Sequence, residues 1–185
     1  FTFRGSGFIV GDGTLALTAA HVIPEPDDKS FGNQLRVRIV AGPQAPEERA
    51  VKVLRIDRSR DVALLALEGA ALPALPLAGR ELAPEGLPIA LMGFPIGGQL
   101  GMIPVVHRGL LSSVASVVMP QSAARQLDAR AVAQLREGGF VIYQLDATAY
   151  PGNSGGPLFD ASSGKVIGLL SMVLAKGSRE VAIGN

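Results

Sequence analysis

Glycine and proline divide this chain into short segments, and this division is what most limits the folds open to it. The 185 residues include 23 Gly and 13 Pro, a content that suits many short strands joined by turns and disfavours a helical bundle. Between the turns, segment 34–40 alternates apolar and polar residues, as in a strand with one solvated face, and segment 62–67 is nearly all apolar. We therefore expect an all-β protein.

Strand-like patterns recur along the whole chain and indicate two halves. We expect strands at residues 1–10, 14–18, 34–40, 50–56, 62–67, 89–92, 103–106, 109–118, 140–145, 158–159, 165–173 and 181–183. The Pro- and Ala-rich stretch 72–88 has little periodicity, so we interpret it as a crossover. We place the boundary near Ala83, within a single domain (1–185) made of one half at about 1–82 and another at about 83–185.

The segment from Pro120 to Gly139 departs from the β pattern. Apolar residues recur there at helical spacing, at positions 124, 127, 131 and 135. Ser122 is a suitable N-terminal cap, and the glycines at 138 and 139 are suitable stop signals. This pattern predicts a helix near 121–137, inserted into the β structure.

Composition argues against several classes of function. The net charge is +1, which gives no reason to expect nucleic acid or an anionic membrane as a partner. No apolar run approaches the roughly 20 residues of a membrane span, so no membrane insertion is expected, and no targeting segment is recognisable. The absence of Cys excludes disulfides and thiol catalysis. Two histidines in unrelated contexts make a poor zinc site, so we expect no metal and no cofactor.

The stretch from Tyr150 to Leu158 is the most distinctive in the chain. It is too rich in Gly and Pro for a helix or a strand interior, which predicts a tight turn. Such a turn presents the Ser154 hydroxyl while the N–H groups of Gly152 and Ser154 point into one concavity. A nucleophile beside two convergent donors suits acyl transfer. An incidental serine in a Gly-rich loop is the alternative, because short motifs often match by chance.

The order of the candidate residues selects among serine-hydrolase arrangements. The turn also reads G-x-S-x-G, but α/β-hydrolases place the acid and then the histidine after the serine. Both histidines here, His21 and His107, precede Ser154. A subtilisin-like order needs Asp, then His, then Ser, and Asp12 precedes His21 by only nine residues, in a turn-like Gly-Asp-Gly. The order His, Asp, Ser remains.

The other candidate residues each have an ordinary alternative role. His21 follows two alanines, so its ring is expected to project from a turn, although a lone histidine is more often a surface or core residue. Asp61 stands directly before segment 62–67, where a carboxylate is either an ordinary loop charge or a buried acceptor for a histidine. Asp57 is the rival acid. His107 lies in a strand context that favours a structural role.

Several motifs together resemble the chymotrypsin/trypsin superfamily of serine proteases. They occur in the family's order at residues 5–9, 17–21, 61–65, 152–157 and 166–171. The HtrA/Deg-type branch is more similar still, on the motifs Gly93-Phe94-Pro95 with Gly97, Gly109-Leu110-Leu111-Ser112 and Asp146-Ala147. The resemblance covers nearly the whole chain and implies two antiparallel six-stranded β-barrels with the active site in the cleft between them.

The resemblance implies a serine endopeptidase that hydrolyses peptide bonds through an acyl-enzyme intermediate. Ser154 matches the nucleophile and His21 the general base. Asp61, followed directly by an apolar strand as in the family, matches the acid that orients the histidine. The N–H groups of Gly152 and Ser154 match the oxyanion hole, with Asn153 assisting. The implied partners are polypeptide substrates.

The resemblance also outlines a primary specificity pocket. Thr148 occupies its base, so no carboxylate is present there for Lys or Arg, and Ser171, Met172 and Val173 form one wall. Val173 stands where trypsin has a glycine, and its branched side chain should narrow the entrance. We therefore expect cleavage after small or medium aliphatic residues.

The resemblance leaves a competing interpretation and several features open. Asn153 stands where trypsin has the acid that pairs with a new N-terminus on activation, so that switch is not expected here. In the HtrA/Deg-type branch the loop before the serine strand, here 120–139, controls the oxyanion hole. The competing interpretation is a latent or non-catalytic trypsin-fold binding module regulated through this insertion. The branch implies a secreted or periplasmic location, and its members often carry peptide-binding domains and form trimers, but flanking domains and a homo-oligomer are left open by this chain.

Overall fold

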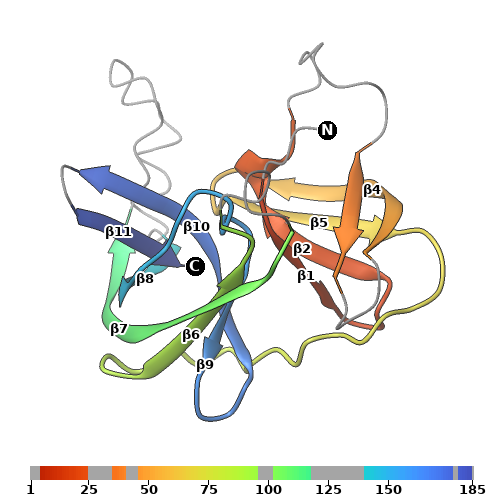
Figure 1. The fold of residues 1–185 in the computed structure, drawn as a ribbon. Helices are drawn as coiled ribbons and strands as arrows, with labels where there is room; N and C mark the ends of the chain where they lie inside the picture. Colours follow the sequence, from red (N-terminus) through yellow and green to blue (C-terminus); the bar gives the residue numbers. More distant parts are fainter. Residues whose placement is uncertain are drawn as a thin grey trace, which may run out of the picture.

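The strands form two antiparallel sheets that lie side by side (Figure 1). The structure is a computed structural model that describes residues 5–24, 35–40, 46–95, 102–117, 140–176 and 179–184. No helix among these residues is long and apolar enough to cross a membrane. The helix expected near 121–137 lies outside the described residues.

The described elements are β1 (Gly7–Val10), β2 (Leu15–Ala19), the 3-10 helix η1 (Ala20–Val22), β3 (Arg36–Ile39), β4 (Glu47–Asp57), β5 (Val62–Leu67), β6 (Pro88–Gly93), β7 (Val105–Val117), β8 (Phe140–Ala147), β9 (Pro157–Asp160), β10 (Val166–Lys176) and β11 (Arg179–Gly184).

The first sheet has the strand order β1-β2-β5-β4-β3. Buried and half-buried side chains alternate along the all-apolar β5, and Ala63, Leu65 and Leu67 form its buried face. They pack with Ala16 of β2 and with Ile23, which follows η1. Because β2 and β5 are antiparallel neighbours, the end of β2 lies beside the start of β5, with Ala19 opposite Val62. The residues that follow β2 and precede β5 are thereby brought together.

The first sheet has five strands among the described residues, not the expected six. The chain after β5 is rich in proline, and residues such as Pro73 and Pro76 have no N–H to donate to a ladder. That stretch contributes only an isolated parallel bridge between Leu77 and Val166. The six-stranded expectation for this half is therefore wrong within the described part of the chain.

The second sheet closes into a six-stranded barrel, as expected, in the order β10-β11-β8-β7-β6-β9. Strand β7 is continuous and includes His107, whereas two separate strands were expected on either side of that residue. A register shift between Leu111 and Ser113 bends β7 without interrupting its pairing with β8. The largest fully buried apolar side chains of the barrel are Ile89, Leu91, Leu111, Leu158 and Leu170.

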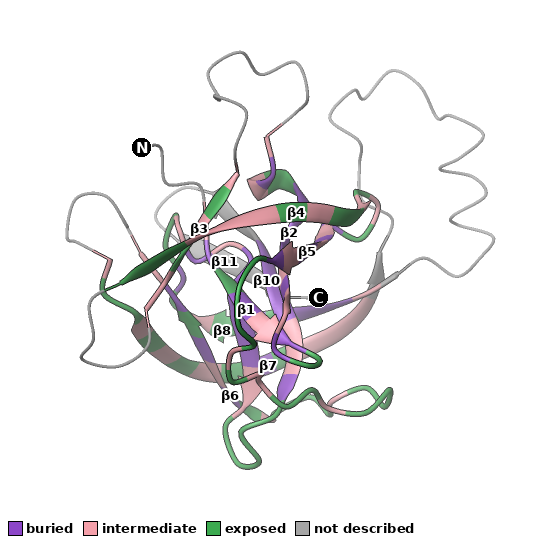
Figure 2. Ribbon diagram, turned by 90° about the vertical axis from the view of Figure 1, so that its right-hand side faces the viewer, coloured by how far each residue is buried: buried purple, intermediate pink, exposed green. Residues whose placement is uncertain are grey.

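An apolar seam joins the two sheets. Phe8 and Val10 of β1 and Ala19 of β2 pack against Val166 and Leu169 of β10. Figure 2 shows the buried residues on the strands at the centre of the molecule and the exposed ones mainly on the peripheral loops. The seam brings together the end of β2, the start of β5 and the middle of β10, and His21 and Asp61 lie there.

Candidate active site

His21 and Asp61 form a doubly hydrogen-bonded pair at the junction of β2 and β5. His21 lies in η1, directly after β2, and Asp61 directly precedes β5. The Nδ1 atom of His21 lies 2.7 Å from Oδ2 of Asp61. The backbone N–H of His21 donates to Oδ1 of the same carboxylate at 2.9 Å. The carboxylate therefore holds both the ring and the backbone of His21, and it leaves the ring's Nε2 on the other side.

The Asp61 carboxylate is buried, with 7% of the residue exposed. A third donor, the hydroxyl of Ser171 in β10, reaches Oδ2 at 2.6 Å. Burial alone would raise the pKa of Asp61, but the hydrogen bonds from the His21 ring, the Ser171 hydroxyl and the His21 backbone outweigh it and hold that pKa below the ordinary value. The carboxylate therefore stays ionised at neutral pH.

The backbone of Asp61 is in the left-handed region, with φ of +54°, which is uncommon for a residue other than glycine. Its carbonyl accepts a hydrogen bond from the N–H of Ala20 at 3.0 Å. Asp61 is thus held by hydrogen bonds to its carboxylate and to its backbone carbonyl. These bonds keep Asp61 in its uncommon backbone conformation, at the position that orients His21.

Asp57, the rival acid, is the last residue of β4, at the opposite end of the short β4–β5 turn from Asp61. One of its oxygens accepts from the Ser59 hydroxyl at 2.6 Å, and the other accepts from the Arg60 guanidinium at 3.0 Å. The Ser59 bond is the main reason that the pKa of Asp57 is lowered. The structure thus brings Asp61 to His21 and leaves Asp57 bonded to Ser59 and Arg60.

Ser154 lies in a tightly bonded turn between β8 and β9. The N–H of Asn153 donates to the carbonyl of Tyr150 at 3.0 Å, and Gly152 has φ of +101°. Proline at 151 and a positive φ at 152 are the features of a type II turn. Within the described part of the chain, the backbone N–H groups of Gly152 and Ser154 have no acceptor. Two neighbouring donors are therefore available on this turn, residues 150–156, which we call the nucleophile turn after the role expected of Ser154.

The nucleophile turn packs against the end of β2, which leads into His21. The carbonyl of Ser154 accepts a hydrogen bond from the N–H of Ser6 at 2.7 Å. Gly155 lies so close to Thr18 and Ala19 that a side chain there would overlap them. Ser154 and His21 therefore lie on the two sides of the same seam.

Asn153 does not face the solvent. Its side chain is fully buried, and both of its amide atoms have no hydrogen-bond partner among the described residues. It packs against the backbone of Gly93 in β6, where an added Cβ would lie 2.6 Å from Oδ1. A side chain in this interior position is poorly placed to assist at an oxyanion hole.

The expected pocket residues have different environments. Thr148 is exposed, as a residue at the base of an open pocket would be. Ser171 belongs to β10, but its hydroxyl is buried and bonded to Asp61. Met172 and Val173 lie in the same strand, and their side chains are outside the described part of the structure. His107 is part-buried beneath Tyr150, with ring centroids 5.6 Å apart.

Ser6 was missed as a functional candidate by the sequence analysis. It makes four hydrogen bonds, two of them to the nucleophile turn. The signal available in the sequence was its position between Gly5 and Gly7, since glycine in a strand often marks a close approach of two backbones.

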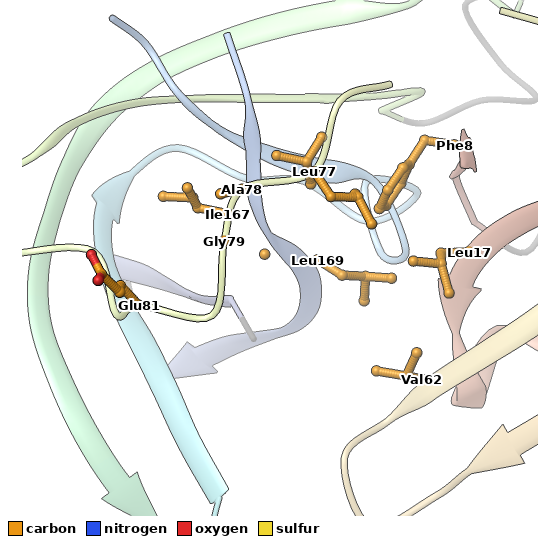
Figure 3. Close-up of a pocket in the computed structure, with 11 residues that line it drawn as sticks. Phe8, Leu17, Val62, Leu77, Ala78, Gly79, Glu81, Ile167 and Leu169 are labelled. Carbon is orange, nitrogen blue, oxygen red and sulfur yellow. The ribbon is translucent and has the colours of Figure 1, made fainter. Parts of the chain in front are cut away.

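A cavity of about 270 Å³ lies at the seam (Figure 3). Its walls are mainly apolar, with Phe8 and Leu17 from the first sheet and Leu77 and Leu169 on the other side. None of the three residues His21, Asp61 and Ser154 lines it. This cavity is therefore separate from the three candidate catalytic residues. The described residues also contain no group of three or more side chains arranged to hold a metal ion.

Comparisons with known proteins identify the family of the chain and proteins that share its fold. Residues 5–169 match the trypsin-like peptidase domain family. The chain is 30% identical over 172 residues to a probable periplasmic serine endoprotease, DegP-like, of Pseudomonas fluorescens, covering 93% of this chain and 30% of that protein. The chain thus spans about a third of the length of the curated relatives it matches.

Two solved structures share the fold. The HtrA-type protease AlgW with decapeptide aligns with a TM-score of 0.68 and 24% identity, over 97% of this chain and 47% of that one. The inactive form of the Rv3671c protease aligns with a TM-score of 0.70 and 23% identity, over 97% of this chain and 77% of that one.

We expect Gly155→Ala to destabilise the protein more than Gly164→Ala. Both glycines have positive φ, +84° and +69°, so either alanine carries a left-handed strain of about 1–2 kcal/mol. A Cβ at 155 would also overlap the Ser6 carbonyl oxygen and lie 2.8 Å from the Ala19 nitrogen, whereas no described atom lies within 4 Å at 164. Overpacking of this kind adds about 1–3 kcal/mol. Urea unfolding measures both losses, and equal values would contradict the packing of the turn against β2.

Proposed function

Since this chain belongs to the trypsin-like peptidase domain family, we propose that it is a serine endopeptidase of the HtrA/Deg type that acts through Ser154, His21 and Asp61. The observation that carries the proposal is the buried, ionised carboxylate of Asp61, which is bonded to both the ring and the backbone of His21. The names of its DegP-like relatives support peptide hydrolysis.

Asp61 sets the protonation pattern of His21. An ionised carboxylate accepts only, so the Nδ1 atom facing it carries a proton and Nε2 is left free to accept one. The Ser154 hydroxyl transfers its proton to Nε2 as its oxygen attacks the carbonyl carbon of the substrate. The buried carboxylate then stabilises the imidazolium without taking the proton itself.

The oxyanion is held by the two free N–H groups of the nucleophile turn. As Ser154 attacks, negative charge develops on the substrate carbonyl oxygen, and the N–H groups of Gly152 and Ser154 stabilise it. The tetrahedral intermediate collapses to an acyl-enzyme as the peptide C–N bond breaks, and His21 gives its proton to the departing amine. Water then enters, loses a proton to His21 and attacks the ester, which releases the acid and regenerates Ser154.

We expect Ser154→Ala to abolish peptide hydrolysis while leaving the unfolding midpoint nearly unchanged, because the substitution removes only the nucleophilic oxygen. The loss in kcat is expected to be on the order of 10⁶-fold. Hydrolysis of an unfolded protein substrate measures it, and a fluorophosphonate probe should label the wild type at Ser154 and not the variant. Comparable turnover by the variant would refute the assignment. A wild type that neither hydrolyses nor takes the label would favour the binding-module alternative.

The two acids provide a matched comparison. Asp61→Asn replaces a carboxylate that holds His21 in one tautomer, and the amide favours the wrong tautomer, so kcat should fall by about 10⁴-fold. Asp57→Asn alters only hydrogen bonds to Ser59 and Arg60, none of which reaches His21, and should leave kcat almost unchanged. Steady-state kinetics of both variants tests the assignment, which equal losses would overturn.

We further propose that cleavage follows small or medium aliphatic residues. Thr148 is exposed and uncharged, which suits a pocket base that does not select Lys or Arg. The resemblance to the family places Val173 in one wall of the pocket, where a branched side chain would narrow the entrance. The proposed partners are polypeptides, and the DegP-like relatives, named as periplasmic, support a periplasmic or secreted location.

A peptide library read by mass spectrometry tests the pocket. The wild type should cleave mainly after Ala, Val or Leu, as a preference and not a rule, because one methylene changes the binding free energy by only about 1–3 kcal/mol. Thr148→Asp should add cleavage after Lys and Arg, and Thr148→Asn, of the same size without the charge, should not. Dominant wild-type cleavage after Arg, Lys or Phe would show that the pocket is misplaced.

A further inference from the structure

We propose that Ser6 is a positioning residue for the oxyanion hole. It forms hydrogen bonds to the carbonyl groups of Gly152 and Ser154, the two residues whose N–H groups are the proposed oxyanion donors. The inference rests on the proposed serine endopeptidase function. Ser6 precedes β1, in the first sheet, and the turn it contacts belongs to the second. It lies far from Gly152 in the sequence, and its hydrogen bonds go to Gly152, Phe94, Ser154 and Thr18 rather than to the His21–Asp61 pair.

Ser6 is buried, with 5% of the residue exposed, and each of its polar atoms has a partner. Its hydroxyl donates to the carbonyl of Gly152 at 2.6 Å and accepts from the N–H of Phe94 at 3.0 Å. Its N–H donates to the carbonyl of Ser154 at 2.7 Å. Its own carbonyl accepts from the Thr18 hydroxyl at 2.7 Å. Ser6 is therefore bonded to the first sheet through Thr18 and to segments of the second half through its other three hydrogen bonds.

The direction of the hydroxyl hydrogen bond follows from the partners alone. A serine hydroxyl has one proton to give, and the Gly152 carbonyl can only accept. The Phe94 N–H can only donate, so it uses a lone pair of the same oxygen. Removing the hydroxyl leaves a carbonyl and an N–H without partners at once, on two different segments of the second sheet.

The hydroxyl of Ser6 fixes one peptide plane in the nucleophile turn. The Gly152–Asn153 peptide is held at its carbonyl by Ser6 and at its N–H by the carbonyl of Tyr150. Gly152 is flexible by nature, because glycine adopts positive and negative φ with similar ease. Its observed φ of +101° is therefore held by the Asn153–Tyr150 hydrogen bond within the turn and by the Ser6 hydroxyl from outside it.

The backbone of Ser6 fixes a second plane two residues further on. The Ser154–Gly155 peptide is held at its carbonyl by the Ser6 N–H and at its own N–H by the carbonyl of Leu170, at 2.6 Å. The residues that supply the two oxyanion donors, Gly152 and Ser154, are thus the same residues whose carbonyl groups Ser6 holds. In each of them a single α-carbon separates the donor N–H from the peptide group that Ser6 fixes. A turn released at Gly152 can reorient its donor N–H, whereas catalysis requires donors within about 2.7–3.1 Å of the oxyanion.

The consequence for catalysis is specific to the transition state. The donors bind the charged oxygen of the tetrahedral intermediate more strongly than the neutral carbonyl of the bound substrate. A shift of about 1 Å in such a group costs up to about 10²-fold in rate. Losing the Ser6 hydroxyl should therefore lower kcat and leave KM comparatively unchanged.

The test compares wild type, Ser6→Ala, Ser6→Cys and Thr18→Val, with rates divided by the concentration of sites that a fluorophosphonate probe titrates. Ser6→Ala should lose about 10- to 100-fold in kcat, with KM nearly constant. A peptidyl trifluoromethyl ketone, whose adduct carries an oxyanion, should bind more weakly by a similar factor. Ser6→Cys keeps a weak donor of similar size and should have an intermediate kcat.

Thr18→Val is the matched control, because it removes one buried hydroxyl bond to Ser6, keeps a side chain of similar size beside Gly155 and removes no hydrogen bond to the turn, and it should retain most of its kcat. An unchanged kcat in Ser6→Ala, a loss equal to that of Thr18→Val, or a loss confined to KM would overturn the inference while leaving the proposed function intact. If Ser6→Ala does not fold, the kcat and ketone affinity of Ser6→Cys decide in the same way. A wild type with neither hydrolysis nor labelling would overturn the proposed function, and the inference with it.

Discussion

The carboxylate of Asp61 is buried between the two sheets, and it accepts hydrogen bonds from both of them. His21, at the end of β2, supplies two donors, and Ser171, in β10, supplies the third. A buried carboxylate without such donors would be strongly destabilising. The ionised group is therefore stable only when the sheets have packed along the apolar seam, so the charge of the site depends on the correct assembly of the fold.

The dependence between the sheets is mutual. The first sheet carries His21, and the second sheet supplies Ser171 to the carboxylate that orients it. The second sheet carries Ser154, and the first sheet supplies Ser6 to the turn that presents it. Each sheet therefore carries one of the proposed catalytic groups and depends on a side chain from the other half to position it. Displacing one sheet relative to the other would disturb the proposed base and the proposed oxyanion hole together.

Much of the fold could be predicted from local sequence patterns. The apolar segment 62–67 coincides with β5, and most other strands were placed within a few residues. The errors also have local causes. His107 and Arg108 interrupt the apolar pattern of β7 although the backbone continues as one strand, and the proline-rich stretch after β5 does not complete a sixth strand in the first sheet. Local polarity marks which residues are exposed more reliably than it marks where pairing ends.

The sequence by itself determined what depends on neighbouring residues: strand periodicity, the turn around Pro151 and Gly152, and the order of His21, Asp61 and Ser154. Only the tertiary structure decided which acid meets the histidine, that the Asn153 side chain is buried, and that Ser6 supports the turn. The first and last of these outcomes depend on directional hydrogen bonds between residues 40, 110 and 146 positions apart, and the burial of Asn153 depends on its packing against Gly93. No local period encodes such contacts, because they form only where the packing of two sheets brings distant backbones within hydrogen-bonding distance.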